Sequence, residues 1–239
     1  MNQNTTHINS LNKNGFAVLD NMYLDSEIAK VIDCIEKATA EQELAESSKN
    51  LFAIRQVITK IPALKPLVFT KKLHELLATL FDAPYFLTKA IYFDKPSESN
   101  WFVAYHQDLS ISVDRKEDVS NYKNWTFKKG QFGVQPPLTI LENIVTIRVH
   151  LDKTEKENGA LKLIPNSHLK GIFRPETIDW KTETEHICEV EKGGVMLMKP
   201  LTLHASNRTT NHKQRRVLHL EFSSKQLAKS MHWLEYCEL

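Results

Sequence analysis

The chain has 239 residues, of which 41% are apolar and 25% are charged, and its formal net charge is +2. This is the composition of an ordinary globular protein that is long enough to bury one substantial core. The small net charge argues against a basic surface for duplex nucleic acid, so we expect no nucleic-acid partner.

Targeting and membrane features are not evident in the sequence. No apolar run is long enough to span a bilayer, and the segment Met1–Ser10 is polar, without the apolar stretch of a secretory signal. The three cysteines, Cys34, Cys188 and Cys237, are far apart and odd in number, which fits a reducing compartment. We therefore expect a cytoplasmic protein, monomeric or homodimeric, with no membrane partner.

The first third of the chain predicts helices that flank a sheet. Gly15–Leu19 is typical of a short strand. Helices are expected from Asp25 to about Leu44 and over Lys72–Phe81, because apolar residues recur there every three or four positions. These positions are Ile28, Val31, Ile32 and Ile35 in the first helix and Leu73, Leu76, Leu77 and Leu80 in the second. We expect the first helix to pack on the outside of a sheet.

From Tyr85 onward, short strand-like segments alternate with turns. Their bounds are Phe86–Phe93, Val103–Val113, Ile144–Leu151, Leu161–Ile164, Val195–Met198 and Val217–Phe222. Most are joined without a helix-length crossover, which favours an antiparallel sandwich or jelly roll over a parallel sheet. The expected fold is mainly β with flanking helices. We expect a single domain over residues 1–239, in which residues 1–84 support a jelly-roll core at about 85–223.

Residues 114–143 interrupt the strand pattern. The segment is polar and aromatic, and Gly130, Gly133 and Pro136-Pro137 divide it. An insertion of this length between two barrel strands is usually functional. We expect it to be lid-like; a surface loop without a catalytic role is the alternative.

The stretch Tyr105-His106-Gln107-Asp108 is the most informative part of the chain. On an extended strand, residues i and i+2 lie on one face, so His106 and Asp108 can offer an imidazole nitrogen and a carboxylate oxygen to one point. A second histidine would complete two His and one carboxylate, a ligand set that suits a non-haem Fe(II) oxygenase. The alternative is a strand with two exposed polar residues and a core-facing Gln107.

A histidine and a pair of arginines follow near the end of the strand-rich region. His204 comes after an apolar strand, a position that also fits a core or rim histidine. Arg215 opens an alternating strand in which it shares a face with His219 and Glu221, whereas Arg216 lies on the other face. If both faces are covered, the Arg215 guanidinium needs a carboxylate partner. A bound diacid such as 2-oxoglutarate would serve, and so would an internal ion pair with Glu221.

Three blocks of sequence, taken in order, resemble the phytanoyl-CoA dioxygenase family of Fe(II)- and 2-oxoglutarate-dependent oxygenases. They run from Phe93 to Ile111, from Thr146 to His168 and from Gly193 to Arg216, and they span most of residues 85–223. The resemblance implies a double-stranded β-helix, the cupin-like jelly roll. Asn166 stands where the family usually has glycine; because asparagine tolerates a left-handed backbone, we expect this turn to persist.

The resemblance also implies roles for individual residues. His106, Asp108 and His204 would be the iron ligands, and Arg215 would hold the distal carboxylate of 2-oxoglutarate. Arg216 would replace Arg215 if the strand register shifted by one residue.

Three further residues are implied on the cofactor side. Ser206 matches a common helper at the distal carboxylate. Arg148 falls where the family often has a cofactor-side residue, and Thr146 shares a strand face with it.

The implied chemistry needs Fe(II), 2-oxoglutarate as co-substrate and O2, and it releases succinate and CO2. Because Asp108 is a carboxylate and not the small residue of related halogenases, hydroxylation of an unactivated C–H bond is the leading expectation, ahead of desaturation or cyclisation. The substrate is expected to be a small molecule, free or as a CoA ester. Residues that could line an entrance are Trp101, Tyr105, Trp125, Phe127 and Gln135.

Two other functions stay open at this point. A metal-binding cupin-like sensor or binding module without turnover would need the metal ligands but no diacid clamp beside them. A protein hydroxylase would need an open groove, whereas an insertion at 114–143 suggests a covered site.

Overall fold

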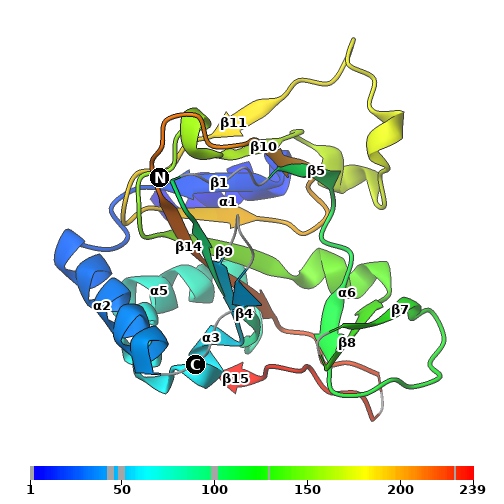
Figure 1. Ribbon diagram of the computed structural model, residues 1–239. Helices are drawn as coiled ribbons and strands as arrows, with labels where there is room; N and C mark the ends of the chain where they lie inside the picture. The colour runs from blue at the N-terminus through cyan, green and yellow to red at the C-terminus, as the bar shows by residue number, and fades with distance from the viewer. Residues whose placement is uncertain (1–2, 42–45, 48–51, 98–101, 129, 229) are drawn as a thin grey trace.

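The computed structural model describes residues 3–41, 46–47, 52–97, 102–128, 130–228 and 230–239 (Figure 1). The helices are α1 (Gln3–Asn14), α2 (Asp25–Glu41), α3 (Val57–Lys60), α4 (Lys65–Val68), α5 (Lys71–Leu80) and α6 (Leu138–Asn143), with the 3-10 turns η1 (Pro62–Leu64), η2 (Lys156–Asn158), η3 (Ser167–Lys170) and η4 (Pro175–Thr177). In these ranges, no helix combines the length and the apolar character that a membrane span requires.

The strands form three antiparallel sheets. Their bounds are β1 (Phe16–Leu19), β2 (Glu46–Ser47), β3 (Phe52–Arg55), β4 (Phe86–Lys95), β5 (Val103–His106), β6 (Ile111–Val113), β7 (Lys123–Lys128), β8 (Gln131–Gln135), β9 (Val145–His150), β10 (Leu161–Leu163), β11 (His186–Cys188), β12 (Val195–Met198), β13 (His204–Ser206), β14 (Arg215–Ser223) and β15 (Cys237–Glu238). The larger sheet has the order β1-β12-β9-β14-β4-β3-β2, with β15 beside β4. The smaller sheets have the orders β11-β10-β13-β5 and β6-β8-β7.

Helices cover the outer face of the larger sheet (Figure 1). Ile28, Val31 and Ile35 on one side of α2 are buried in the same apolar cluster as Ile147 of β9 and Leu218 of β14. This packing explains why α2 forms, since burial of its apolar stripe stabilises a helix that would be marginal alone. The mainly β fold with flanking helices is confirmed.

The predicted N-terminal helices agree with the structure to within a few residues. α2 begins at Asp25 and is described to Glu41; the expected extension to Leu44 lies outside the described residues. α5 begins one residue earlier than predicted, after Thr70, whose hydroxyl accepts a hydrogen bond from the Leu73 N–H. The helix α1 was not predicted, because few apolar residues mark it; Leu11 is its buried anchor.

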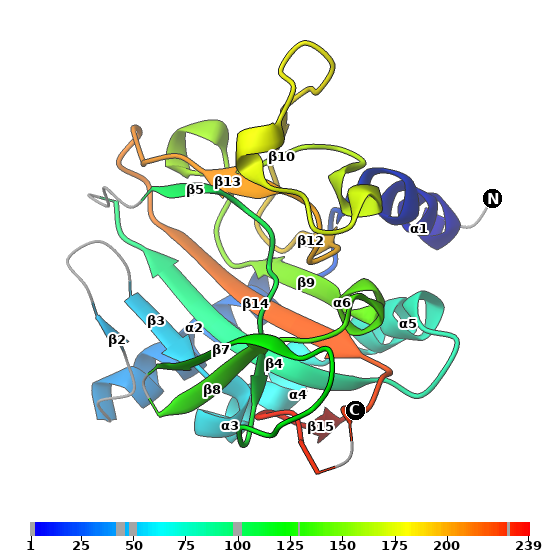
Figure 2. The same ribbon diagram turned by 90° about the vertical axis from the view of Figure 1, so that its right-hand side faces the viewer.

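The inner face of the larger sheet lies opposite the sheet β11-β10-β13-β5 (Figure 2). One cavity of about 230 Å³ is lined by β4, β9 and β14 of the larger sheet and by β5, β10 and β13 of the smaller one. The three predicted iron ligands, together with Arg148, Ser206 and Arg215, line this space.

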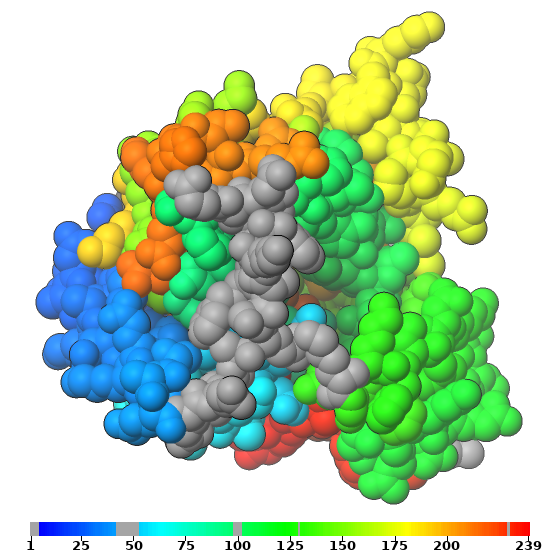
Figure 3. All heavy atoms as spheres, viewed as in Figure 1, coloured from blue at the N-terminus to red at the C-terminus, as the bar shows by residue number. Residues whose placement is uncertain are grey.

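The insertion at 114–143 folds into structure of its own. It forms the hairpin β7–β8, which pairs with β6, and then the helix α6. In the space-filling view, this part of the chain (green) makes up the lower right of the molecule (Figure 3). Tyr122, Val134 and Leu141 bury their side chains in a small core shared with Trp233 near the C-terminus. The insertion therefore packs as an ordered part of the fold and is not an unstructured loop.

Candidate metal centre and adjoining cavities

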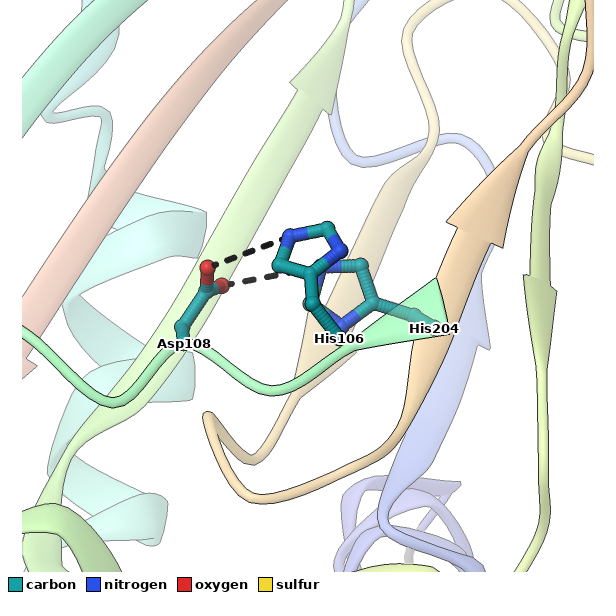
Figure 4. A group of neighbouring side chains, drawn as sticks. All are labelled: His106, Asp108 and His204. Atoms are coloured by element: carbon teal, nitrogen blue, oxygen red, sulfur yellow. Dashed lines mark ion pairs between the residues drawn. The ribbon is translucent and has the colours of Figure 1, made fainter. Parts of the chain in front are cut away.

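Two histidines and an aspartate converge where the smaller sheet meets the larger one. His106 at the end of β5 is paired with His204 at the start of β13. The Nε2 atoms of His106 and His204 each lie 3.8 Å from one oxygen of Asp108 (Figure 4). One ligand atom from each of the three residues lies within 4.8 Å of the other two, so small side-chain movements would let all three bind one metal ion.

Backbone hydrogen bonds orient both imidazoles. The Nδ1 atom of His106 lies 2.9 Å from the carbonyl oxygen of Ala104, and Nδ1 of His204 lies 2.9 Å from that of Thr202. A carbonyl oxygen only accepts, so each Nδ1 carries the hydrogen and each Nε2 keeps a lone pair. Histidine ligands of metals are usually held by a second hydrogen bond of this kind. The Nε2 lone pairs are therefore available to a cation beside Asp108.

The protonation states also suit a metal centre. Burial lowers the pKa of His204 to about 4, and the neighbouring Asp108 only partly opposes this change. Burial alone would raise the pKa of Asp108, but His204, His219 and Lys89 outweigh it and lower the pKa to about 2. At neutral pH the site therefore offers a neutral imidazole and a carboxylate, the forms that bind a metal.

The backbone reaches this arrangement differently from the sequence prediction. The expected strand Val103–Val113 is broken, because β5 ends at His106 and Asp108 lies in the following loop. The Gln107 side chain holds that loop. Its Nε2 donates to the carbonyl oxygens of Leu201 at 2.6 Å and Gly171 at 2.9 Å, and its Oε1 accepts from the Phe173 N–H at 2.8 Å. Gln107 faces inward, as the alternative of a strand with a core-facing Gln107 expected. The side chains of its neighbours His106 and Asp108 nevertheless both point to the candidate metal site.

Arg215 is buried beside the candidate ligands, and no carboxylate among the described residues pairs with it. Its side chain lines the 230 Å³ cavity with His106, Asp108 and His204, and 7% of its surface is exposed. The Nε and Nη1 atoms of Arg215 are buried and have no hydrogen-bond partner in the described part of the chain. Burial and the nearby Arg148 lower the pKa of Arg215 to about 9. A cation buried this way is costly unless a ligand supplies an anion.

Arg216 and Glu221 have other partners. Arg216 points to the opposite side of β14, where its Nε and Nη2 each donate to a different oxygen of Asp152 at 2.9 Å. The alternative of an Arg215–Glu221 ion pair is wrong. Glu221 Oε1 instead lies 2.8 Å from Nζ of Lys89 and 3.0 Å from Nε2 of His219. Arg215 is thus the arginine that faces the cavity, and its internal partner is missing among the described residues.

A sequence model of the phytanoyl-CoA dioxygenase (PhyH) family matches residues 11–217. The chain belongs to this family. The match includes most of the jelly roll, the insertion and the candidate ligands, so the resemblance noted in the sequence is confirmed. Comparison with curated proteins finds no match.

Solved structures support the same fold. The epimerase SnoN, in complex with Fe3+, alpha ketoglutarate and nogalamycin RO, is 13% identical, with a TM-score of 0.68 over 92% of this chain and 83% of its own. The carbocyclase SnoK of nogalamycin biosynthesis is 15% identical, with a TM-score of 0.67 over 91% of this chain and 83% of its own. HygX from Streptomyces hygroscopicus, with nickel, 2-oxoglutarate and hygromycin B bound, is 16% identical, with a TM-score of 0.65 over 91% and 86%. At such identities the likeness concerns the fold.

The remaining predicted cofactor-side residues separate into two groups. Ser206 and Arg148 line the 230 Å³ cavity with Arg215. Thr146 is fully buried and its hydroxyl has no partner, but it does not line that cavity. Thr146 and Arg148 share a face of β9, as predicted, and His150 lies on the same face, away from the helices, because Ile147 and Val149 occupy the helix-covered core.

His219 is a site residue to which the sequence analysis gave no role. Nη1 of Arg148 lies 3.0 Å from Nδ1 of His219, and since a guanidinium only donates, Nδ1 must accept. Nε2 of His219 therefore donates to Glu221. Burial opposes ionisation of Glu221, but Lys89 and His219 lower its pKa. This chain of contacts orients Arg148. In the sequence, the indication of a role for His219 was the alternation of Arg215, Val217, His219 and Glu221, which places His219 on the same face of the strand as Arg215.

A second cavity, of about 380 Å³, adjoins the first. Phe93, Asp108 and His219 line both cavities, and β7 and β8 of the insertion form a wall of the second. Four of the expected entrance residues, Tyr105, Trp125, Phe127 and Gln135, line neither cavity, and the fifth, Trp101, lies outside the described residues. The insertion contributes different residues instead, among them Thr126 and Phe132.

Proposed function

We propose that the protein is an Fe(II)- and 2-oxoglutarate-dependent dioxygenase that hydroxylates an unactivated C–H bond of a small molecule. The balanced reaction takes the substrate, 2-oxoglutarate and O2 to the hydroxylated product, succinate and CO2. The observation that carries the proposal is the convergence of His106, Asp108 and His204 beside Arg215, a buried guanidinium with unpaired donors. A bound iron would account for the convergence of the three ligands, and a bound diacid would account for the unpaired donors of the guanidinium.

The three candidate ligands fit iron. Two imidazole nitrogens and one carboxylate oxygen on one side of a metal leave positions open, as in non-haem Fe(II) oxygenases. In this proposal, the backbone carbonyls of Ala104 and Thr202 orient His106 and His204 so that both Nε2 atoms face the iron.

The buried cations fit 2-oxoglutarate. Arg215 would hold the distal carboxylate through its unpaired Nε and Nη1, with the Ser206 hydroxyl beside it in the same cavity. Arg148, fixed by His219, would add positive charge on the metal side. When bound, iron and 2-oxoglutarate supply the oxidant, and the side chains position the reactants and keep bulk water out.

Hydroxylation is proposed from the nature of the third ligand. Asp108 keeps a carboxylate at the position where a halogenase would leave room for a halide, so oxygen transfer to carbon is the simplest outcome. The fold alone does not select a reaction, since SnoN is an epimerase and SnoK a carbocyclase. A small-molecule substrate is favoured by the relatives as well, because SnoN and HygX were crystallised with nogalamycin RO and hygromycin B.

A direct test is succinate formation from 2-oxoglutarate. The purified protein, loaded with Fe(II) under anaerobic conditions, should release succinate when O2 is admitted, even slowly in the absence of substrate. N-oxalylglycine should inhibit this release, and an anaerobic sample is the control. Binding of Fe(II) and 2-oxoglutarate without any oxygen-dependent succinate would contradict the proposal and favour a metal-binding module without turnover.

A further inference from the structure

The second cavity has the position that a substrate site requires. Its lining shares Phe93, Asp108 and His219 with the cavity that holds the candidate ligands. A molecule bound there would contact the carboxylate of Asp108 directly and would reach the metal position without crossing the protein. The cavity is also separate from Arg215 and Ser206, which line only the first cavity, so a co-substrate there would leave it free.

Polar groups dominate one side of the second cavity. The hydroxyl-bearing or amide-bearing residues of its lining are Ser110, Ser112, Thr126 and Gln131. The apolar lining is limited to Ile91, Phe93 and Phe132, with Phe93 at the boundary with the metal centre. Hydroxyl and amide groups lose free energy when an apolar ligand covers them without replacing their hydrogen bonds. The mixed lining therefore favours a ligand that carries hydroxyl groups beside its apolar parts.

The same lining carries an excess of positive charge. Lys89 is balanced by Glu221 at 2.8 Å, and its ammonium also donates to the Ser110 carbonyl at 3.3 Å, which uses two of its three hydrogens. Lys128 of β7 adds a further cation. In the described lining, the other carboxylate is Asp108, which is a candidate metal ligand. An anionic group on the ligand would be attracted to this side of the cavity.

The size of the cavity limits the ligand. About 380 Å³ lies near the lower end of the range of about 300–1,000 Å³ that small-molecule sites occupy. A single metabolite fits this space, whereas the whole of a CoA thioester would not.

We propose that this cavity binds a small, hydroxyl-bearing metabolite with a carboxylate or phosphate group, and that Lys128 binds the anionic group. Lys128 ends β7 at the exposed rim of the insertion, so the anionic end would lie outward and the reacting carbon would lie toward Asp108. The proposal rests on the proposed function, because it takes the first cavity to be the iron and 2-oxoglutarate site. It assigns a role in substrate recognition to the insertion.

The test uses protein loaded with Mn(II) and N-oxalylglycine, so that no turnover occurs. Titration calorimetry would compare glucose 6-phosphate and gluconate, which are anionic, with glucose, which is neutral. We expect anionic members to bind at least about tenfold more tightly than their counterparts, and Lys128→Glu to reduce that affinity about tenfold. Lys123→Glu is the matched control, since Lys123 lies exposed on the same strand and does not line the cavity.

The outcomes separate the two proposals. If Mn(II) and N-oxalylglycine fail to bind, the proposed function itself is wrong and this inference falls with it. If both bind but no anionic probe binds, or glucose binds as tightly as its anionic counterparts, only the inference is overturned. Equal weakening by Lys123→Glu and Lys128→Glu would also overturn it, because a diffuse surface field and not Lys128 would then attract the anion. Retained Mn(II) binding by Lys128→Glu shows that the variant is folded.

Discussion

His106 lies directly opposite His204 across the β5–β13 strand pair, and the centroids of their rings are 4.3 Å apart. Opposed residues of an antiparallel pair point to the same side, so the pairing register alone places both imidazoles on one face. The third candidate ligand, Asp108, lies in the loop after β5. Its own backbone N–H donates to the carbonyl oxygen of Pro200 at 2.9 Å, which holds the residue beside the two imidazoles. Strand pairing and loop anchoring thus assemble one site from distant parts of the chain.

Loss of either ligand from the β5 segment should remove metal binding. Replacing His106 or Asp108 with alanine leaves two protein ligands, and we expect the affinity for Fe(II) or Mn(II) to fall more than about 100-fold, with loss of succinate formation. Metal content after dialysis is the direct measurement. His232→Ala is the control, because His232 is exposed and is not one of the candidate metal ligands. Undiminished metal binding by His106→Ala would refute the ligand assignment.

The two adjacent arginines should behave differently. Arg215→Ala removes the buried cation of the cavity, and we expect 2-oxoglutarate to bind about 100-fold more weakly. Arg216→Ala breaks the two-point contact with Asp152, so it should lower the free energy of unfolding by about 1–3 kcal/mol and leave 2-oxoglutarate binding unchanged. Calorimetric titration and urea denaturation measure the two effects. An affinity loss confined to Arg216→Ala would show that the clamp is assigned to the wrong residue.

Gln107 should affect metal affinity although it does not face the site. Gln107→Ala leaves the carbonyls of Leu201 and Gly171 and the N–H of Phe173 without their partner, and the loop that carries Asp108 should loosen. We expect a loss of about 2 kcal/mol in unfolding free energy and about tenfold weaker Mn(II) binding. Gln226→Ala, at an exposed glutamine, is the control. A stable variant with wild-type metal affinity would argue against this positioning role.

Glu235 should make stability depend on pH. Burial raises its pKa to about 7, although the Ala90 N–H donates to Oε2 at 2.7 Å and lowers it. The unfolded carboxyl ionises near 4.5, so between pH 4.5 and 7 the folded state binds more protons. Stability from this group is therefore fully present below pH 4.5 and lost as pH rises through 7.

A variant isolates this contribution of Glu235. Between pH 4.5 and 7, wild type should lose up to roughly 3 kcal/mol of unfolding free energy relative to Glu235→Gln. Buried His150 and His204, whose pKa values are lowered, act with the opposite sign in both proteins and cancel in the difference. Urea denaturation at several pH values measures it. A difference that does not change with pH would mean that the carboxyl is ionised in the folded protein.

Local patterns in the sequence were sufficient for the fold class and for which residues share a face. The spacing of Ile28, Val31 and Ile35 predicted the buried side of α2, and alternation predicted that Arg215 and Arg216 lie on opposite faces of β14. Asn166 adopts a left-handed backbone, with φ of 65°, as expected for the residue in place of glycine. These features depend on periodicity and on the backbone preferences of single residues, which a sequence displays directly.

Only the tertiary structure shows which side chains are in contact with one another. The sequence left Glu221 open as a partner of Arg215, and only the packing of β4 against β14 brings Lys89 to Glu221 in its place. An inward-facing Gln107 was one alternative in the sequence. Its three backbone partners, however, come from residues 171, 173 and 201, which no local pattern connects to it. Pairing between distant segments is decided by strand register and by the balance of buried charges, and both are properties of the folded chain as a whole.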